Sequence, residues 1–281
     1  MGWARIYLQQ DGEKPLMQGS FSIQDDVHHI QLRSAYSKVR RRSDVAAIER
    51  SEESMIVYRG SDMVYGPTKR DSTTSPSCGA DKLDFNSHAF PGLQSRSFTL
   101  GSFYSPKKRQ SGNIGTGNLR GTIGNNAGCP TEQRVALLGI ATDCTYTASF
   151  ASDEAIRQNL IQVVNSASDT YERQFNIALG LKNVTILDGN CPTTASSVTP
   201  WNLPCSQGDI ESRLDSFSKW RGGLGDDNAY WTMMSTCASG RSVGLAWLGQ
   251  LCVSALTGYS GQSVSGANVV VRTQGEWQVF A

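Results

Sequence analysis

Short runs of alternating or mainly apolar residues dominate residues 3–63 of the chain. Polar turns separate these runs, which is typical of antiparallel strands with one solvated face. The runs read "WARIYL", "LMQGSFSI", "HHIQL" and "SMIVYRGSDM". A charged stretch, "SKVRRRSDVAAIERSEES", interrupts them and is interpreted as a solvated loop or short helix rather than a binding patch. The pattern predicts a small antiparallel β domain.

Residues 66–128 are rich in Ser, Gly, Pro, Thr and Asn, and no regular structure is predicted for most of them. Within this region, "GNIGTGNLRGTIGNNAG" superficially resembles a nucleotide-binding loop. It follows no strand, opens no helix and lacks the G-x-G-x-x-G spacing, so residues 111–128 are predicted to be a flexible linker.

The pattern changes after residue 129. A continuous apolar run, "RVALLGIATDC", predicts a buried central strand. Helical spacing follows, behind a candidate N-cap at Ser152 with acidic residues in the first turn, and predicts a helix of about twenty residues. Its apolar positions are Ile156, Leu160, Val163, Val164, Ala167 and Tyr171.

A second strand is predicted at residues 175–188, and Asp209 is expected to cap a shorter helix that carries Ile210, Leu214 and Phe217. Three more strand candidates follow: "NAYWTMMST", "VGLAWLGQLC" and "ANVVVRT". This order of strands and helices predicts an α/β fold with a mixed, mostly parallel sheet.

The composition limits the number of domains and the kinds of partner that are expected, but it does not identify a function. The chain has 281 residues, enough for two domains, with 38% hydrophobic residues, 18% charged residues and a formal net charge of +1. This balance gives no reason to expect nucleic acid or a membrane surface as partner. No apolar run reaches the length of about 18 residues that a membrane span needs, so no transmembrane segment is predicted. The start, "MGWARIYLQQDGEKP", has no apolar core of a signal peptide.

The seven cysteines carry more information. Six lie between residues 129 and 252, which predicts a disulfide framework and an oxidising compartment. The sequon at Asn183 agrees with secretion. The disulfide candidates are Cys129, Cys144, Cys191, Cys205, Cys237 and Cys252.

Pairing cannot be read from the sequence, but Cys191 and Cys205 flank a Pro-rich loop and are the favoured local pair. An odd count leaves at least one thiol free or paired outside the chain. Cys78, alone in "TSPSCGADKLDF", is the first candidate for that thiol, and Cys252 is the other.

Six motifs in the second half of the chain together resemble one protein family. They are "VALLGIATDCTYTASF", "ASDTYERQFNIALGL", "DNAYWTMMSTC", "GLAWLGQLC", "VSGANVVVRT" and "EWQVFA". Residues 129–281 resemble the N-terminal part of the catalytic domain of reprolysin (ADAM-type) zinc metalloproteases, most closely the fungal branch. Residues 1–110 are similar to the propeptide of that group. The resemblance implies a β-rich propeptide domain followed by an incomplete metzincin-like domain.

The resemblance also implies a role for Cys78. In this family a propeptide cysteine in an S-C-G context keeps the protease latent, because its thiolate replaces water on the catalytic zinc. The implied release point is Lys108 and Arg109, within "KKR", where a kexin-type processing protease would cut. The basic run at residues 40–42 is a competing site, but a cut after Arg109 would separate Cys78 from the catalytic domain.

The family binds zinc through H-E-x-x-H-x-x-G-x-x-H. The histidines of this chain are His28, His29 and His88, none is followed by Glu, and all are interpreted as ordinary propeptide residues. In relatives, the segment like "EWQVFA" directly precedes the zinc helix. The chain as given is therefore expected to be a fragment truncated before that motif, to bind no cofactor and to be inactive. Zinc is implied for the full-length family member.

One part of a substrate cleft is implied within the chain. "GLAWLG", which comprises Gly244, Leu245, Ala246, Trp247, Leu248 and Gly249, corresponds to the edge strand that pairs with extended substrate in the family. Each apolar side chain of this strand is expected to lie in the sheet core.

Two functions remain open from the sequence. The first is a fragment of a zinc metalloendopeptidase zymogen that acts on protein substrates, secreted or membrane-tethered in its full-length form. The second is a naturally short, non-catalytic binding or regulatory protein. An unrelated disulfide-rich module would fit the composition but not the ordered motifs.

Overall fold

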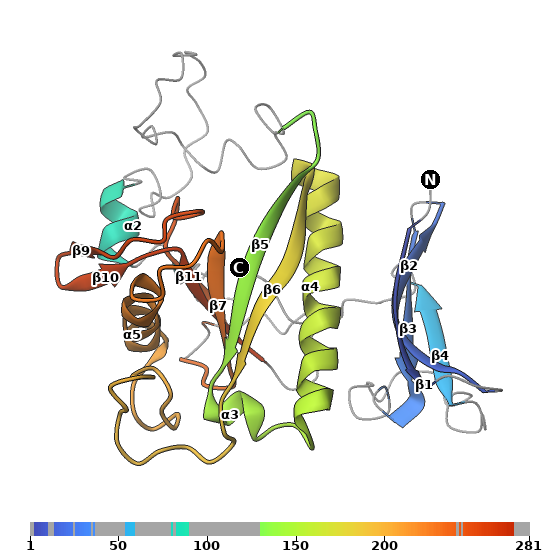
Figure 1. The fold of residues 1–281 in the computed structure, drawn as a ribbon, viewed down its shortest axis with the longest axis horizontal. Coiled ribbons are helices and arrows are strands. Elements are labelled where there is room, and N and C mark those ends of the chain that lie inside the picture. Colours follow the sequence, from blue (N-terminus) through green and yellow to red (C-terminus); the bar gives the residue numbers. More distant parts are fainter. Residues whose placement is uncertain are drawn as a thin grey trace, which may run out of the picture.

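The structure is a computed structural model that describes residues 3–10, 14–24, 26–34, 36, 54–59, 80, 83–89, 130–239, 242 and 244–272. The strands of the described residues form a four-stranded sheet, a five-stranded sheet and a two-stranded hairpin. Helix α4 stands between the two larger sheets (Figure 1).

The N-terminal sheet confirms the predicted antiparallel unit. Its strand order is β1-β2-β3-β4, and every neighbouring pair is antiparallel. The strands are β1 (Ala4–Gln10), β2 (Leu16–Ile23), β3 (Asp26–Leu32) and β4 (Met55–Arg59). Local alternation was a sufficient signal here because each strand pairs with its neighbour in the sequence.

The five-stranded sheet has the order β6-β5-β7-β11-β8. All neighbours are parallel except β8, which runs antiparallel to β11. The strands are β5 (Arg134–Thr142), β6 (Ile177–Ile186), β7 (Tyr230–Ser235), β8 (Gly244–Ala246) and β11 (Ala267–Val271). The predicted mixed, mostly parallel sheet is therefore confirmed.

Helices α4 (Asp153–Phe175) and α5 (Ile210–Gly222) cover opposite faces of this sheet. Successive strand residues alternate between the faces, so that Met233 packs with α5 while Met234 packs with α4. Both predicted caps are present, because Ser152 accepts a hydrogen bond from the Ala155 N–H and Asp209 accepts one from the Ser212 N–H.

A glycine at the middle of β5 permits close packing on the α5 face. A Cβ at Gly139 would lie 2.3 Å from ring atoms of Trp231 on β7. The strand register also shifts between Leu138 and Gly139. Any larger residue there would displace the tryptophan from the core.

Three short elements were not predicted. They are α2 (Asp84–Ala89), α3 (Cys144–Thr147) and the hairpin of β9 (Thr257–Tyr259) with β10 (Gln262–Val264). Each is too short to show a periodic pattern. The strand predicted at residues 243–252 is also shorter, since β8 ends at Ala246 and the chain then turns through Gly249 and Cys252, both with positive φ.

The predicted pair Cys191–Cys205 is wrong. The structure pairs Cys144 with Cys191 and Cys205 with Cys237, each with a Cα–Cα distance of 5.0 Å. Sequence proximity misled the prediction, because the fold brings the loop after β6 back to the end of β5. Cys252 is exposed and forms no disulfide among the described cysteines, and Cys129 lies outside the described residues.

Candidate functional site

Strand β8 forms one outer edge of the five-stranded sheet. One side of it pairs with β11, through Gly244 opposite Val270, Leu245 opposite Val269 and Ala246 opposite Asn268. Among the residues that the structure describes, no strand pairs with its other side. An edge of this kind presents backbone N–H and C=O groups to which an extended peptide can add as a further strand.

Two of the apolar side chains of residues 244–249 lie in the core, as expected. Leu245 and Trp247 are only 3% and 4% exposed and belong to the cluster beneath α5. The Trp247 indole N–H donates to Ser218 Oγ on α5, at 2.6 Å. Leu248 is partly buried and Gly249 is exposed. The strand can therefore offer a ligand its backbone rather than these two buried side chains.

Helix α2 lies along this outer edge. The Asn86 side-chain amide donates to the Ala246 carbonyl at 2.9 Å, and its oxygen accepts from the Leu248 N–H at 2.9 Å. Phe85 makes edge-to-face ring contacts with Trp247 and Tyr259, at centroid distances of 5.9 and 5.7 Å. Residues 83–89 fall within the part of the sequence that was predicted to be a propeptide, yet they pack on the larger sheet.

The described histidines do not form a metal centre. On β3, His28 stacks on Phe21 at a centroid distance of 4.8 Å and His29 stacks on Tyr58 at 5.2 Å, while His88 on α2 lies against Tyr259. Burial lowers the pKa of His29. Among the residues that the structure describes, no group of three His, Cys, Asp or Glu side chains is arranged to hold a metal ion. These residues do not fit a zinc site.

A buried ion pair at the carboxyl end of β5 was missed from the sequence. Asp143 and Arg213 are 0% and 2% exposed and meet at 3.2 Å. Asp143 also accepts from Ser235 Oγ at 2.5 Å and caps α3 by accepting from the Tyr146 N–H at 2.8 Å. Arg213 donates to the carbonyls of Leu203 and Pro204.

This cluster is structural. Its hydrogen bonds join the ends of β5 and β7, α3, α5 and the loop before α5 in one largely buried network. Burial lowers the pKa of Arg213, which the charge of Asp143 partly offsets. A charged residue directly after an apolar strand was the available signal, but its partner lies 70 residues away.

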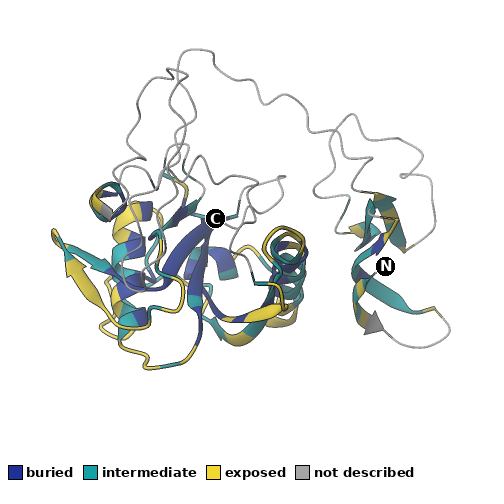
Figure 2. Ribbon diagram, turned by 90° about the horizontal axis from the view of Figure 1, so that it is seen from above, coloured by how far each residue is buried: buried dark blue, intermediate teal, exposed yellow. Residues whose placement is uncertain are grey.

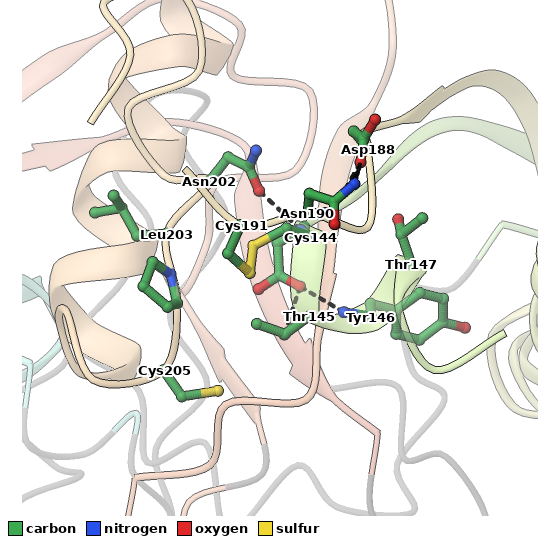
Figure 3. The surroundings of a disulfide bond; sticks show 12 residues. Cys144, Thr145, Tyr146, Thr147, Asp188, Asn190, Cys191, Asn202, Leu203 and Cys205 are labelled. Carbon is green, nitrogen blue, oxygen red and sulfur yellow. Dashed lines mark hydrogen bonds between the residues drawn. A yellow bond between two sulfur atoms is a disulfide. The ribbon is translucent and has the colours of Figure 1, made fainter. Parts of the chain in front are cut away.

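The disulfides reinforce the same end of the sheet. Cys144, the first residue of α3, bonds to Cys191, and its N–H donates to Asn202 Oδ1 at 2.8 Å (Figure 3). Cys205–Cys237 joins the loop before α5 to the segment after β7. Together they tie the long connection between β6 and α5 to the strand ends.

The remaining predicted sites fall into two groups. Cys78, Lys108 and Arg109 lie outside the described residues. Asn183 is exposed on β6, the other edge strand of the sheet, and its side-chain oxygen accepts from Asn228 Nδ2 at 2.9 Å. An exposed asparagine is accessible to a glycosylating enzyme.

Comparison with known families identifies the class. Residues 131–281, more than half of the chain, match the model of Metallo-peptidase family M12, of the reprolysin type. The chain belongs to this metallopeptidase family.

Similar curated proteins extend the match to the N-terminal part. The chain is 50% identical to a "Disintegrin and metalloproteinase domain-containing protein B" of Aspergillus fumigatus and 43% identical to one of Arthroderma otae. Each match covers 100% of this chain but only 39% of the relative, so the chain spans about two fifths of their length.

A solved structure, metalloproteinase-II from Bacteroides fragilis, matches 52% of this chain and 40% of its own, with 11% identity and a TM-score of 0.27. That overlap is too low for a comparison of sites. No helix among the described residues combines the length and apolar character that crossing a bilayer requires.

Proposed function

We propose that the chain is the propeptide and the N-terminal part of the protease domain of a zinc metalloendopeptidase zymogen. The observation that carries the proposal is β8, an antiparallel edge strand beside a parallel sheet, in a chain of family M12. Its outer backbone groups suit an extended protein substrate. The division into residues 1–110, 111–128 and 129–281 is part of the proposal.

The three histidines of the chain are His28, His29 and His88, and the described residues offer no zinc site. We propose that these 281 residues alone do not hydrolyse peptides, and that zinc is bound only by the full-length protein. The part present here contributes the substrate edge and the sheet against which a metal-bearing helix would pack.

Latency is proposed to depend on Cys78, whose thiolate would occupy the open position of the zinc in the full-length protein. A kexin-type protease would release the propeptide at Lys108 and Arg109. In the full-length protein, Cys78→Ser is expected to raise the activity of the uncleaved zymogen toward a quenched fluorescent peptide. Equal latency of the variant and the parent protein would refute the switch.

The secretory pathway is the proposed compartment, in a secreted or membrane-tethered form. Two disulfides support it, since such bonds persist in oxidising environments. Asn183 is the proposed glycan acceptor. When the protein is secreted from a fungal host, endoglycosidase treatment should lower its mass by one glycan. The Asn183→Gln variant should not show this loss of mass, whereas the Asn190→Gln variant should. An unchanged pattern in both variants would exclude this site.

The deciding experiment is to sequence the native transcript through both ends of this reading frame. A frame that continues into H-E-x-x-H-x-x-G-x-x-H and begins with a signal peptide supports the zymogen. A stop codon directly after residue 281 would refute it in favour of a non-catalytic binding protein.

A further inference from the structure

We propose that helix α2 is a second latch on the protease domain, which uses the Asn86 side chain to occupy the outer edge of β8 in place of a bound peptide. The proposal rests on the proposed function, because it assumes that this edge takes an extended protein substrate. It concerns only described residues and requires no metal. It therefore differs from the thiolate latch assigned to Cys78.

The hydrogen bonds of Asn86 resemble those of a strand. Ala246 and Leu248 are alternate residues, so the Ala246 carbonyl and the Leu248 N–H leave the same edge of the chain. These are the groups that an added peptide would bind through its own N–H and C=O. The side-chain amide of Asn86 carries one donor group and one acceptor, and it satisfies both backbone groups at 2.9 Å.

Burial and a third hydrogen bond keep the Asn86 side-chain amide in this position. Asn86 is 0% exposed, and its nitrogen donates a further hydrogen bond to the Ala80 carbonyl at 3.0 Å. A buried amide is costly unless its groups are paired. Moving it away from β8 would leave both its own polar atoms and the two backbone groups without partners, unless water replaced them.

Apolar contacts of the residues before Asn86 also hold the helix in place. Leu83 is 1% exposed and belongs to the cluster that also contains Leu245 and Trp247. Phe85 packs against the Trp247 ring, and its backbone N–H donates to Gln262 Oε1 on the β9–β10 hairpin at 3.1 Å. A propeptide segment thus supplies core residues to the larger unit.

The consequence is that proteolysis alone does not free the edge. A cut after Arg109 would leave residues 83–89 on the propeptide side, still docked on β8 by these contacts. The cleaved propeptide is therefore expected to remain as a competitive inhibitor until it dissociates. An extended peptide and α2 cannot use the Ala246 and Leu248 groups at the same time.

The first test measures amide hydrogen exchange in the full 281-residue chain. Asn86→Leu keeps the approximate side-chain volume but removes both hydrogen bonds, so exchange at the Leu248 amide should rise about tenfold. Asp84→Asn, an exposed position on the same helix, is the matched control and should leave it unchanged. Amides of β5 and β7 report whether the fold is intact, and Asn86→Ala, which also removes both hydrogen bonds, replaces the leucine variant if it is not. Unchanged exchange at Leu248 would overturn the proposal.

The second test uses the full-length protein with a quenched fluorescent peptide as substrate. Cys78→Ser zymogen should remain partly latent, and Cys78→Ser with Asn86→Leu should reach the activity of the mature enzyme. Full activity of Cys78→Ser alone would overturn the second latch. An inactive mature enzyme would instead refute the proposed function, while the hydrogen-exchange result would still report whether Asn86 closes the edge.

Discussion

The two sheets of this protein differ in how much core each one has. Among the described residues of β1–β4, Ile30 is the only buried apolar side chain, whereas Ile6, Leu8, Ile23 and Val57 are between 45% and 56% exposed. The five-stranded sheet has a buried cluster on each face. Figure 2 shows the contrast, with the N-terminal strands mostly intermediate or exposed and the central strands mostly buried.

The N-terminal sheet is attached to α4 largely by polar contacts. Arg5 pairs with Glu172 and donates to the Asn165 carbonyl at 3.0 Å, and the Tyr7 hydroxyl donates to Glu154 at 2.6 Å. Contacts of this kind contribute little each, since they are partly solvated. The five-stranded sheet thus has the larger core, and the N-terminal sheet is bound to the surface of α4 mainly by polar contacts, as expected for the propeptide proposed above.

The largest effect is expected at the buried ion pair beside the five-stranded sheet. Asp143→Ala leaves Arg213 charged and unpaired in the core, and should lower the free energy of unfolding by about 3–5 kcal/mol. Urea unfolding followed by tryptophan fluorescence measures it. Asp227→Ala, which removes an exposed ion pair with Lys182, is the control and should leave the urea midpoint almost unchanged. Equal effects would show that the network does not support the fold.

Removing the disulfide Cys205–Cys237 should have the next largest effect. It closes a loop with a sequence separation of 32, so the double Cys→Ser variant should lose about 3 kcal/mol, mainly because the unfolded chain gains freedom. Cys252→Ser, at an exposed cysteine without a disulfide in the described part, should change little. If the two variants unfold at the same urea concentration, the crosslink contributes nothing.

A smaller effect is expected at the surface between the two units. Arg5→Ala should weaken the attachment of the N-terminal sheet by about 1 kcal/mol and speed hydrogen exchange in β1 and β2 without altering β5 or β7. Lys14→Ala, at an exposed residue, is the matched control. Faster exchange in both sheets would mean that the two units unfold together.

The smallest effect is a pH dependence confined to the N-terminal sheet. Burial lowers the pKa of His29, partly offset by Asp169 and Asp26, while His28 lowers it further. The unfolded state therefore binds a proton at His29 more readily than the folded state does. The stability that the neutral His29 side chain contributes is fully present above the ordinary histidine pKa of about 6.5 and declines as the pH falls below it.

Hydrogen exchange of β2 and β3 at pH 7.5 and pH 5.5 tests this expectation. His29→Gln should reduce the extra exchange at low pH, whereas His88→Gln, on α2, should not. Identical pH profiles for the parent chain and His29→Gln would contradict it.

The elements that were predicted correctly are those whose signal is local. The caps at Ser152 and Asp209 and the apolar runs at β5 and β11 were visible because the side-chain pattern follows the period of the element. The pairing of Cys191 was predicted wrongly because nearness in sequence was the only available guide. Helix α2 went unpredicted because its six residues are held by distant partners such as Trp247 and Tyr259.

The sequence by itself determined the family, the antiparallel N-terminal sheet, the two long helices and the apolar strands, since ordered motifs and local periodicity carry that information. Only the tertiary structure decided the disulfide partners, the Asp143–Arg213 pair and the closing of β8 by Asn86. These last features depend on contacts between residues 32 to 162 positions apart in the chain. No local pattern encodes such contacts, because they arise only when the packed core brings distant segments together.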